Sequence, residues 1–164
     1  MKADNEDIED RIFQGFQAPT NIPWQVRLRM PYLTLPFIAL CGGTILDKNT
    51  ILTAAHCVVN AIDNIPSFLV ISGRHTQYPG QTVRVDEVYV HPQYEHVYEQ
   101  RILNDIAVLK LKTPLNIEEG VVQPACLPGS SFAPINGEIV ATSGWGLTQQ
   151  TNDIPPEALQ VQQD

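Results

Sequence analysis

Short apolar runs, each broken by turn residues, follow one another along most of this chain, and helical spacing of apolar residues is rare. Strands bounded by Gly, Pro, Asn and Asp give this pattern. It therefore predicts an all-β protein. The expected strands are residues 24–29, 37–46, 51–54, 67–73, 81–90 and 106–111.

The predicted strand that ends at Val90 has a slip in its apolar alternation. Val83 and Val85 share one phase, whereas Val88 and Val90 follow on the other. A β-bulge at residues 86–87 (Asp-Glu) would absorb one residue and bend the strand, as the corner of a small closed barrel requires. The alternative is an irregular loop between two shorter strands. The bulge favours a barrel over a flat sheet.

Charge and length narrow the classes of function. The chain has 164 residues, a net charge of −8 and a pI near 4.8. This charge repels phosphate backbones and anionic lipid surfaces, so we expect no nucleic-acid and no membrane partner. No apolar run reaches the ~18 residues of a transmembrane helix. All-β enzymes of two barrels usually need about 200–250 residues, so we expect an incomplete chain that acts on protein or peptide partners.

Two residues have the chemistry of a proton-transfer pair. Histidine, with an unperturbed pKa of about 6.5, suits a general base near neutral pH, and His56 is the candidate. Asp105 precedes an apolar strand that would bury its carboxylate, and such burial is costly without a partner. Alone, either residue would be interpreted as a structural histidine or a turn aspartate. Their sequence contexts, taken together, favour a pair.

Those contexts resemble a known family. Residues 52–57 (Leu-Thr-Ala-Ala-His-Cys) and 104–107 (Asn-Asp-Ile-Ala) are similar to the histidine and aspartate motifs of trypsin-like serine proteases, the S1 family with the chymotrypsin fold. Further matches arrive in family order and cover nearly the whole chain from Arg11. They are Arg11–Ile12, Pro23–Val26, Cys41–Gly43, Cys126–Pro128 and Gly144–Gly146.

The resemblance implies a domain organisation. Residues 1–11 would be an acidic propeptide-like segment, and residues 12–115 a complete first six-stranded antiparallel β-barrel that carries His56 and Asp105. Residues 116–136 would connect the barrels, and residues 137–164 would begin an incomplete second barrel. An unrelated secreted β-barrel with chance matches is the bland alternative.

The resemblance also implies a serine-type endopeptidase in which His56 is the general base and Asp105 orients it. The nucleophilic serine is absent, because no Gly-Asp-Ser-Gly-Gly occurs in the sequence. We therefore expect the isolated chain to be inactive and any enzyme to be incomplete as given. The alternative is a non-catalytic protease homologue that acts as a binding or regulatory module. No serine has the surrounding glycines of an oxyanion hole; the serines are Ser67, Ser72, Ser130, Ser131 and Ser143.

The same resemblance implies roles for the three cysteines of the chain. Cys41 and Cys57 would form a disulfide, the alternative being two reduced core cysteines, and Cys126 would bridge to a partner outside this chain. A disulfide indicates an oxidising, extracellular compartment, although residues 1–10 have no apolar core of a signal peptide. Protease inhibitors are further expected partners.

Arg11 and Ile12 would be the activation cleavage site of a zymogen. Phe13 and Gln14 depart from the usual Val-Gly there, and the loss of glycine removes backbone freedom that an inserting terminus uses.

We expect no cofactor and no metal. The segment at 74–82, where some family members bind calcium, has no carboxylate. A zinc site lacks the usual ligand spacing; the residues considered for it are His56, Cys57, His75, His91 and His96.

Overall fold

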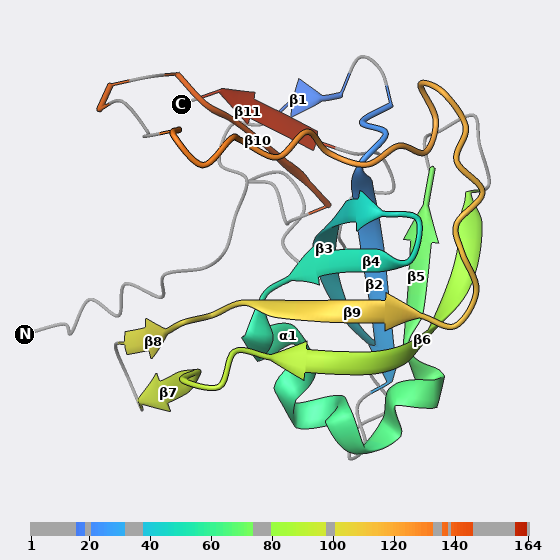
Figure 1. Ribbon diagram of the computed structural model, residues 1–164, viewed down its shortest axis with the longest axis vertical. Helices are drawn as coiled ribbons and strands as arrows, with labels where there is room; N and C mark the ends of the chain where they lie inside the picture. The colour runs from blue at the N-terminus through green and yellow to red at the C-terminus, as the bar shows by residue number, and fades with distance from the viewer. Residues whose placement is uncertain are drawn as a thin grey trace, which may run out of the picture.

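A closed antiparallel barrel of six strands forms most of the computed structural model (Figure 1). The structure describes residues 16–18, 21–31, 38–73, 80–97, 101–132, 136–137, 139–145 and 160–163. The strand order around the barrel is β2-β3-β4-β9-β6-β5. The bounds are β2 Gln25–Pro31, β3 Ile38–Asp47, β4 Thr50–Thr53, β5 Leu69–Ser72, β6 Gln81–Val90 and β9 Ala107–Leu111. All six strands predicted from the sequence are confirmed, and these six make the barrel.

Alternation along the strands fills the barrel. Val26, Leu28 and Met30 on β2 are at most 1% exposed, and Val70 on β5 and Leu109 on β9 are equally buried. Burying a side chain of this size fully contributes roughly 1.5–3 kcal/mol. The barrel interior is therefore a packed hydrophobic core that supports residues at its rim.

β6 contains the predicted bulge. Val85 pairs with Leu111 on β9, but the next pair along is Glu87 with Lys110, so the register shifts by one residue between Val85 and Glu87. The strand continues through the shift without a loop. The bulge is confirmed, and the alternative of two short strands joined by an irregular loop is wrong.

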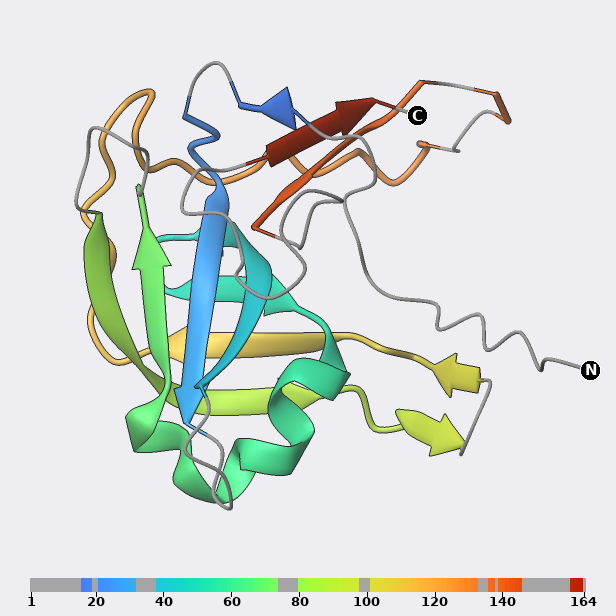
Figure 2. The same ribbon diagram turned by 180° about the vertical axis from the view of Figure 1, so that it is seen from behind.

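Helical residues cover one end of the barrel. The short helix α1 (Ala55–Val58) follows β4 and leads into the 3₁₀ helix η1 (Val59–Ser67), which crosses the barrel end in both views (Figures 1 and 2). The predicted strand at 67–73 starts later, at Leu69, because η1 extends through Ser67. A hairpin of β7 (Glu95–Val97) and β8 (Arg101–Leu103) projects from the side.

A second, smaller sheet lies at the other end of the barrel (Figure 2). Its order is β1 (Phe16–Gln17), β11 (Gln160–Gln163) and β10 (Ala141–Gly144), all antiparallel. The predicted segment of the first barrel, 12–115, includes β1. In the structure β1 pairs with residues 160–161 of β11 and so belongs to the second sheet.

Hydrogen bonds fasten the connecting segment to the barrel. The main-chain N–H groups of Gln123 and Ala125 donate to the carbonyls of Pro23 and Ile45. Beyond the connection, the hydroxyl of Ser143 on β10 donates to Gln25 Oε1 on β2 over 2.9 Å.

Within the described part of the chain, no helix has the length and apolar character needed to cross a membrane.

Candidate active site

The first candidate side chain, that of His56, is held at the barrel rim by α1. Ala55 and Val58 are fully buried, which fixes the helix against the core and turns His56 outward. The side chain of His56 is 41% exposed, so its ring is accessible from solvent. The helix that carries this histidine has four residues, about one turn.

The second candidate side chain, that of Asp105, follows a turn with a left-handed residue. Asn104 has a φ of 53°, in the left-handed region that asparagine tolerates better than most residues. Its Nδ2 donates to the carbonyl of Gln93 over 2.7 Å, and the N–H of Ile106 donates back to its carbonyl over 2.8 Å. The next buried residue, Ala107, begins β9. This turn directs Asp105 toward His56 on α1, and Ile106, the next residue, is 43% exposed.

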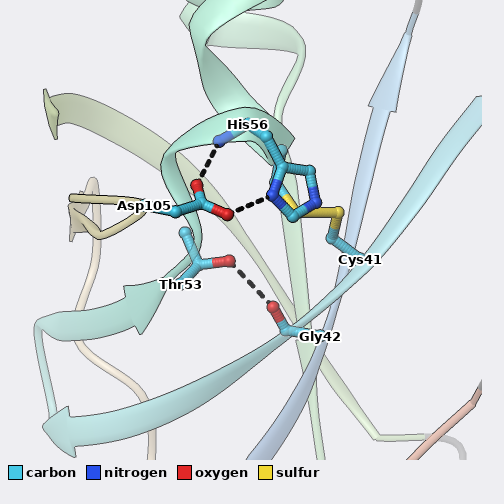
Figure 3. Close-up of a disulfide and its surroundings, with 6 residues drawn as sticks. Cys41, Gly42, Thr53, His56 and Asp105 are labelled. Atoms are coloured by element: carbon cyan, nitrogen blue, oxygen red, sulfur yellow. Dashed lines mark hydrogen bonds and ion pairs between the residues drawn. A yellow bond between two sulfur atoms is a disulfide. The ribbon is translucent and has the colours of Figure 1, made fainter. Parts of the chain in front are cut away.

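Asp105 contacts His56 at two points (Figure 3). Its Oδ2 lies 2.6 Å from His56 Nδ1, and its Oδ1 accepts the main-chain N–H of His56 over 2.8 Å. One carboxylate thus holds both the backbone and the ring of the same residue. A carboxylate acceptor at Nδ1 assigns the ring proton to that nitrogen and leaves the lone pair on Nε2.

Electrostatics keep this carboxylate ionised. Partial burial by itself would raise the pKa of Asp105, but hydrogen bonds from the side chain and backbone of His56 outweigh it, and the net pKa is lowered. The carboxylate is therefore a fixed negative charge at neutral pH. Such a charge orients an imidazole and stabilises its protonated form.

Tyr94 was not singled out from the sequence, yet it lies close enough to Asp105 to be influenced by its charge. Burial raises the pKa of the Tyr94 hydroxyl, and the charge of Asp105 adds to this effect. The hydroxyl is buried and has no hydrogen-bond partner among the residues that the structure describes. No motif surrounds Tyr94, so only its place in the fold reveals it.

A disulfide between Cys41 on β3 and Cys57 on α1 lies beside the ring of His56 (Figure 3). The hydroxyl of Thr53 also donates to the carbonyl of Gly42 over 2.8 Å and joins β4 to β3 just before α1. The turn that carries the histidine is therefore fastened to β3 at two adjacent places.

The other predicted site residues lie elsewhere. Arg11, Ile12 and His75 fall outside the described residues, as do residues 74–79 of the segment considered for calcium. Cys126 is exposed and is a free thiol. Ser143, which lies on β10 of the second sheet, donates a hydrogen bond to Gln25 on β2 of the barrel.

Comparisons with known sequences agree with this geometry. The sequence model of the family described as Trypsin matches residues 12–163. Serine protease 56 of the mouse, Mus musculus, is 34% identical over 137 residues, which are 83% of this chain and 21% of that protein. The chain thus spans about a fifth of this curated relative.

Solved structures share the fold. The scabies mite inactivated protease paralogue S-I1 is 32% identical, with a TM-score of 0.73 over 91% of this chain and 63% of its own. Neuropsin, a serine protease expressed in the limbic system of mouse brain, is 26% identical, with a TM-score of 0.74 over 93% and 63%. The chain covers less than two thirds of either structure.

Proposed function

The chain belongs to the trypsin family and has its all-β fold, and on that premise we propose that it supplies the general base and the orienting carboxylate of a serine-type endopeptidase. The observation that carries this proposal is the two-point contact between Asp105 and His56. A histidine held only for structure does not need an exposed ring whose second nitrogen is free to accept a proton.

His56 acts as the base through Nε2. Its Nδ1–H donates a hydrogen bond to Asp105, so Nε2 is the nitrogen that accepts the proton of an attacking hydroxyl and later returns it to the leaving amine. Asp105 stays ionised throughout, because its pKa is lowered, and it stabilises the imidazolium that forms. The disulfide at Cys57 limits movement of the helix that carries the base.

The nucleophile belongs to the complete protein in this proposal. No Gly-Asp-Ser-Gly-Gly sequence occurs among the 164 residues. The isolated chain is therefore expected to have no peptidase activity. Protein or peptide substrates, protease inhibitors as partners and secretion to an oxidising compartment are parts of the same proposal. The activation cut between Arg11 and Ile12 and the partner of the exposed Cys126 stay predictions.

A second candidate function is that of a non-catalytic homologue that binds other proteins. One observation favours it: a solved structure that is 32% identical to this chain is described as an inactivated protease paralogue. The kept His56–Asp105 pair argues against it, because a binding module has no use for an oriented base.

Labelling with a fluorophosphonate probe, which reacts with activated serines, separates the two functions. The complete product of the gene that encodes this chain should be labelled, and His56→Ala should abolish the labelling while His91→Ala retains it. A complete, folded product that takes no label would support the non-catalytic homologue. Label on the isolated 164-residue chain, with contaminating proteases excluded, would contradict the assignment of the nucleophile to the complete protein.

A further inference from the structure

The disulfide and the free nitrogen of His56 bring three metal-ligating side chains together. Cys57 Sγ lies 3.4 Å from His56 Nε2, and the ligand atoms of Cys41, His56 and Cys57 all lie within 4.8 Å of one another. We propose that reduction of this disulfide creates a zinc site with the two thiolates and Nε2 of His56 as ligands. Cys41, which the fold supplies from β3, is the ligand that sequence spacing does not reveal.

The distances suit tetrahedral zinc. Zn–S bonds of about 2.3 Å and Zn–N bonds of about 2.0–2.1 Å place neighbouring sulfur and nitrogen ligands about 3.6 Å apart. The Cys57 Sγ to His56 Nε2 distance of 3.4 Å is already near this value. Once the S–S bond is broken, the two sulfurs can separate to the ~3.8 Å of a shared zinc ion. A water molecule would complete the coordination from the exposed side of the ring.

Asp105 prepares the histidine for a metal. Ligand histidines usually donate their other ring N–H to a carboxylate, which fixes the tautomer and makes the metal-binding nitrogen more basic. His56 Nδ1 has this carboxylate partner at 2.6 Å. The same hydrogen bond that serves the proposed base therefore also serves a zinc ligand.

The chemistry balances with a dithiol as reductant. The dithiol transfers two electrons and two protons to the Cys41–Cys57 bond and becomes a disulfide, and the two cysteines become thiols. Zinc then displaces the two thiol protons to solvent. Because the ion occupies Nε2, the reduced, zinc-bound form has no free base. The zinc site itself does not depend on the proposed peptidase function.

Zinc titration of reduced protein tests the site. The Cys126→Ser variant, which lacks the exposed free thiol, is reduced with dithiothreitol, freed of reductant under anaerobic conditions and titrated with zinc alone against a chromophoric chelator. We expect one zinc ion per reduced chain and at least ten-fold weaker binding by the oxidised chain. In the same background, His56→Ala and Cys57→Ser should each weaken binding more than ten-fold, and Asp105→Asn about 10–100-fold. His91→Ala is the matched control and should bind as the parent does.

Cobalt(II) alone gives a second readout. A thiolate-to-cobalt charge-transfer band should appear on the reduced chain, and Cys57→Ser should remove most of it. Zinc should also raise the melting temperature of the reduced chain, because an ion that binds only the folded state stabilises it. If His56→Ala and His91→Ala affected zinc binding equally, the zinc would be held by unfolded thiols and the proposal would be overturned. A reduced chain that binds no more zinc than the oxidised chain would also overturn it.

Discussion

The carboxylate of Asp105 accepts two hydrogen bonds from His56, one from the main-chain N–H over 2.8 Å and one from Nδ1 over 2.6 Å. The two residues are 49 positions apart in the sequence. The barrel brings them together, because β4 and β9 are neighbouring antiparallel strands, β4 ends shortly before His56, and β9 begins shortly after Asp105. The pairing of these two strands thus positions the two residues.

The acid dependence of stability should reflect Asp105. Its pKa is lowered in the folded protein, so its contribution to the free energy of unfolding is complete above the usual value near 3.8 and is lost as the pH falls through the lower folded value. Urea unfolding of the parent chain and of Asp105→Asn over the acid range should show a difference that shrinks on acidification. A difference that grows as the pH falls below 3.8 would contradict the lowered pKa.

Loss of the disulfide should be costly. Cys41 and Cys57 are separated by 16 positions, and closing a loop of this size stabilises a protein by about 3 kcal/mol. The double variant Cys41→Ala with Cys57→Ala should lose about this free energy of unfolding in urea. Cys126→Ala, which removes an exposed free thiol, is the control and should change stability by less than about 0.5 kcal/mol. Equal stability of the double variant and the control would refute the stapling role.

Two adjacent glycines on β3 should differ in their tolerance of a methyl group. A Cβ at Gly43 would lie 3.0 Å from the side chains of Val26 and Ile51 and from a backbone carbonyl, whereas a Cβ at Gly42 would meet only the flexible end of Gln25 at 3.3 Å. Gly43→Ala should therefore lower the free energy of unfolding by about 1–3 kcal/mol, since overpacking strains a core. Thermal unfolding of Gly42→Ala should show the smaller loss, and the reverse order would be inconsistent with this packing.

The turn before Asp105 should depend on the left-handed conformation of Asn104. Asn104→Ala loses the hydrogen bond to the carbonyl of Gln93. It also holds an alanine, whose β-carbon disfavours the left-handed region, at a φ of 53°. Asn104→Gly loses the same bond without the steric cost. Chemical denaturation should find the alanine variant less stable than the glycine variant by about 1 kcal/mol. If the two were equally stable, backbone strain at this turn would have no measurable role.

Much of this architecture could be predicted from the sequence, because alternating burial along a strand appears in the sequence as alternating apolar and polar residues. All six barrel strands and the bulge after Val85 follow from the positions of Val, Ile and Leu. The short pieces could not be predicted in the same way. β1 and β7 have two and three residues, too few for a period to be visible, and β1 is formed by pairing with β11 from the far end of the chain.

The candidate site likewise has residues that the sequence reveals and residues that only the fold reveals. His56 and Asp105 stand in sequence contexts that mark them as a pair, whereas Tyr94 has no such context and becomes visible only because the fold buries its hydroxyl near Asp105. The closeness of Cys41 to the ring of His56 was likewise implied only through the disulfide. Contacts between residues distant in sequence are decided by strand order and register, which no single segment encodes.

The central claim is that His56 is the base of a serine endopeptidase, and steady-state cleavage of a peptide ester tests it most directly. The complete gene product and its His56→Ala variant should differ in kcat by at least about 10³-fold, because removal of a catalytic histidine abolishes activation of the serine. His91→Ala should retain the parent rate. Retention of activity by the folded His56→Ala variant, or the absence of any activity in the complete parent protein, would contradict the account.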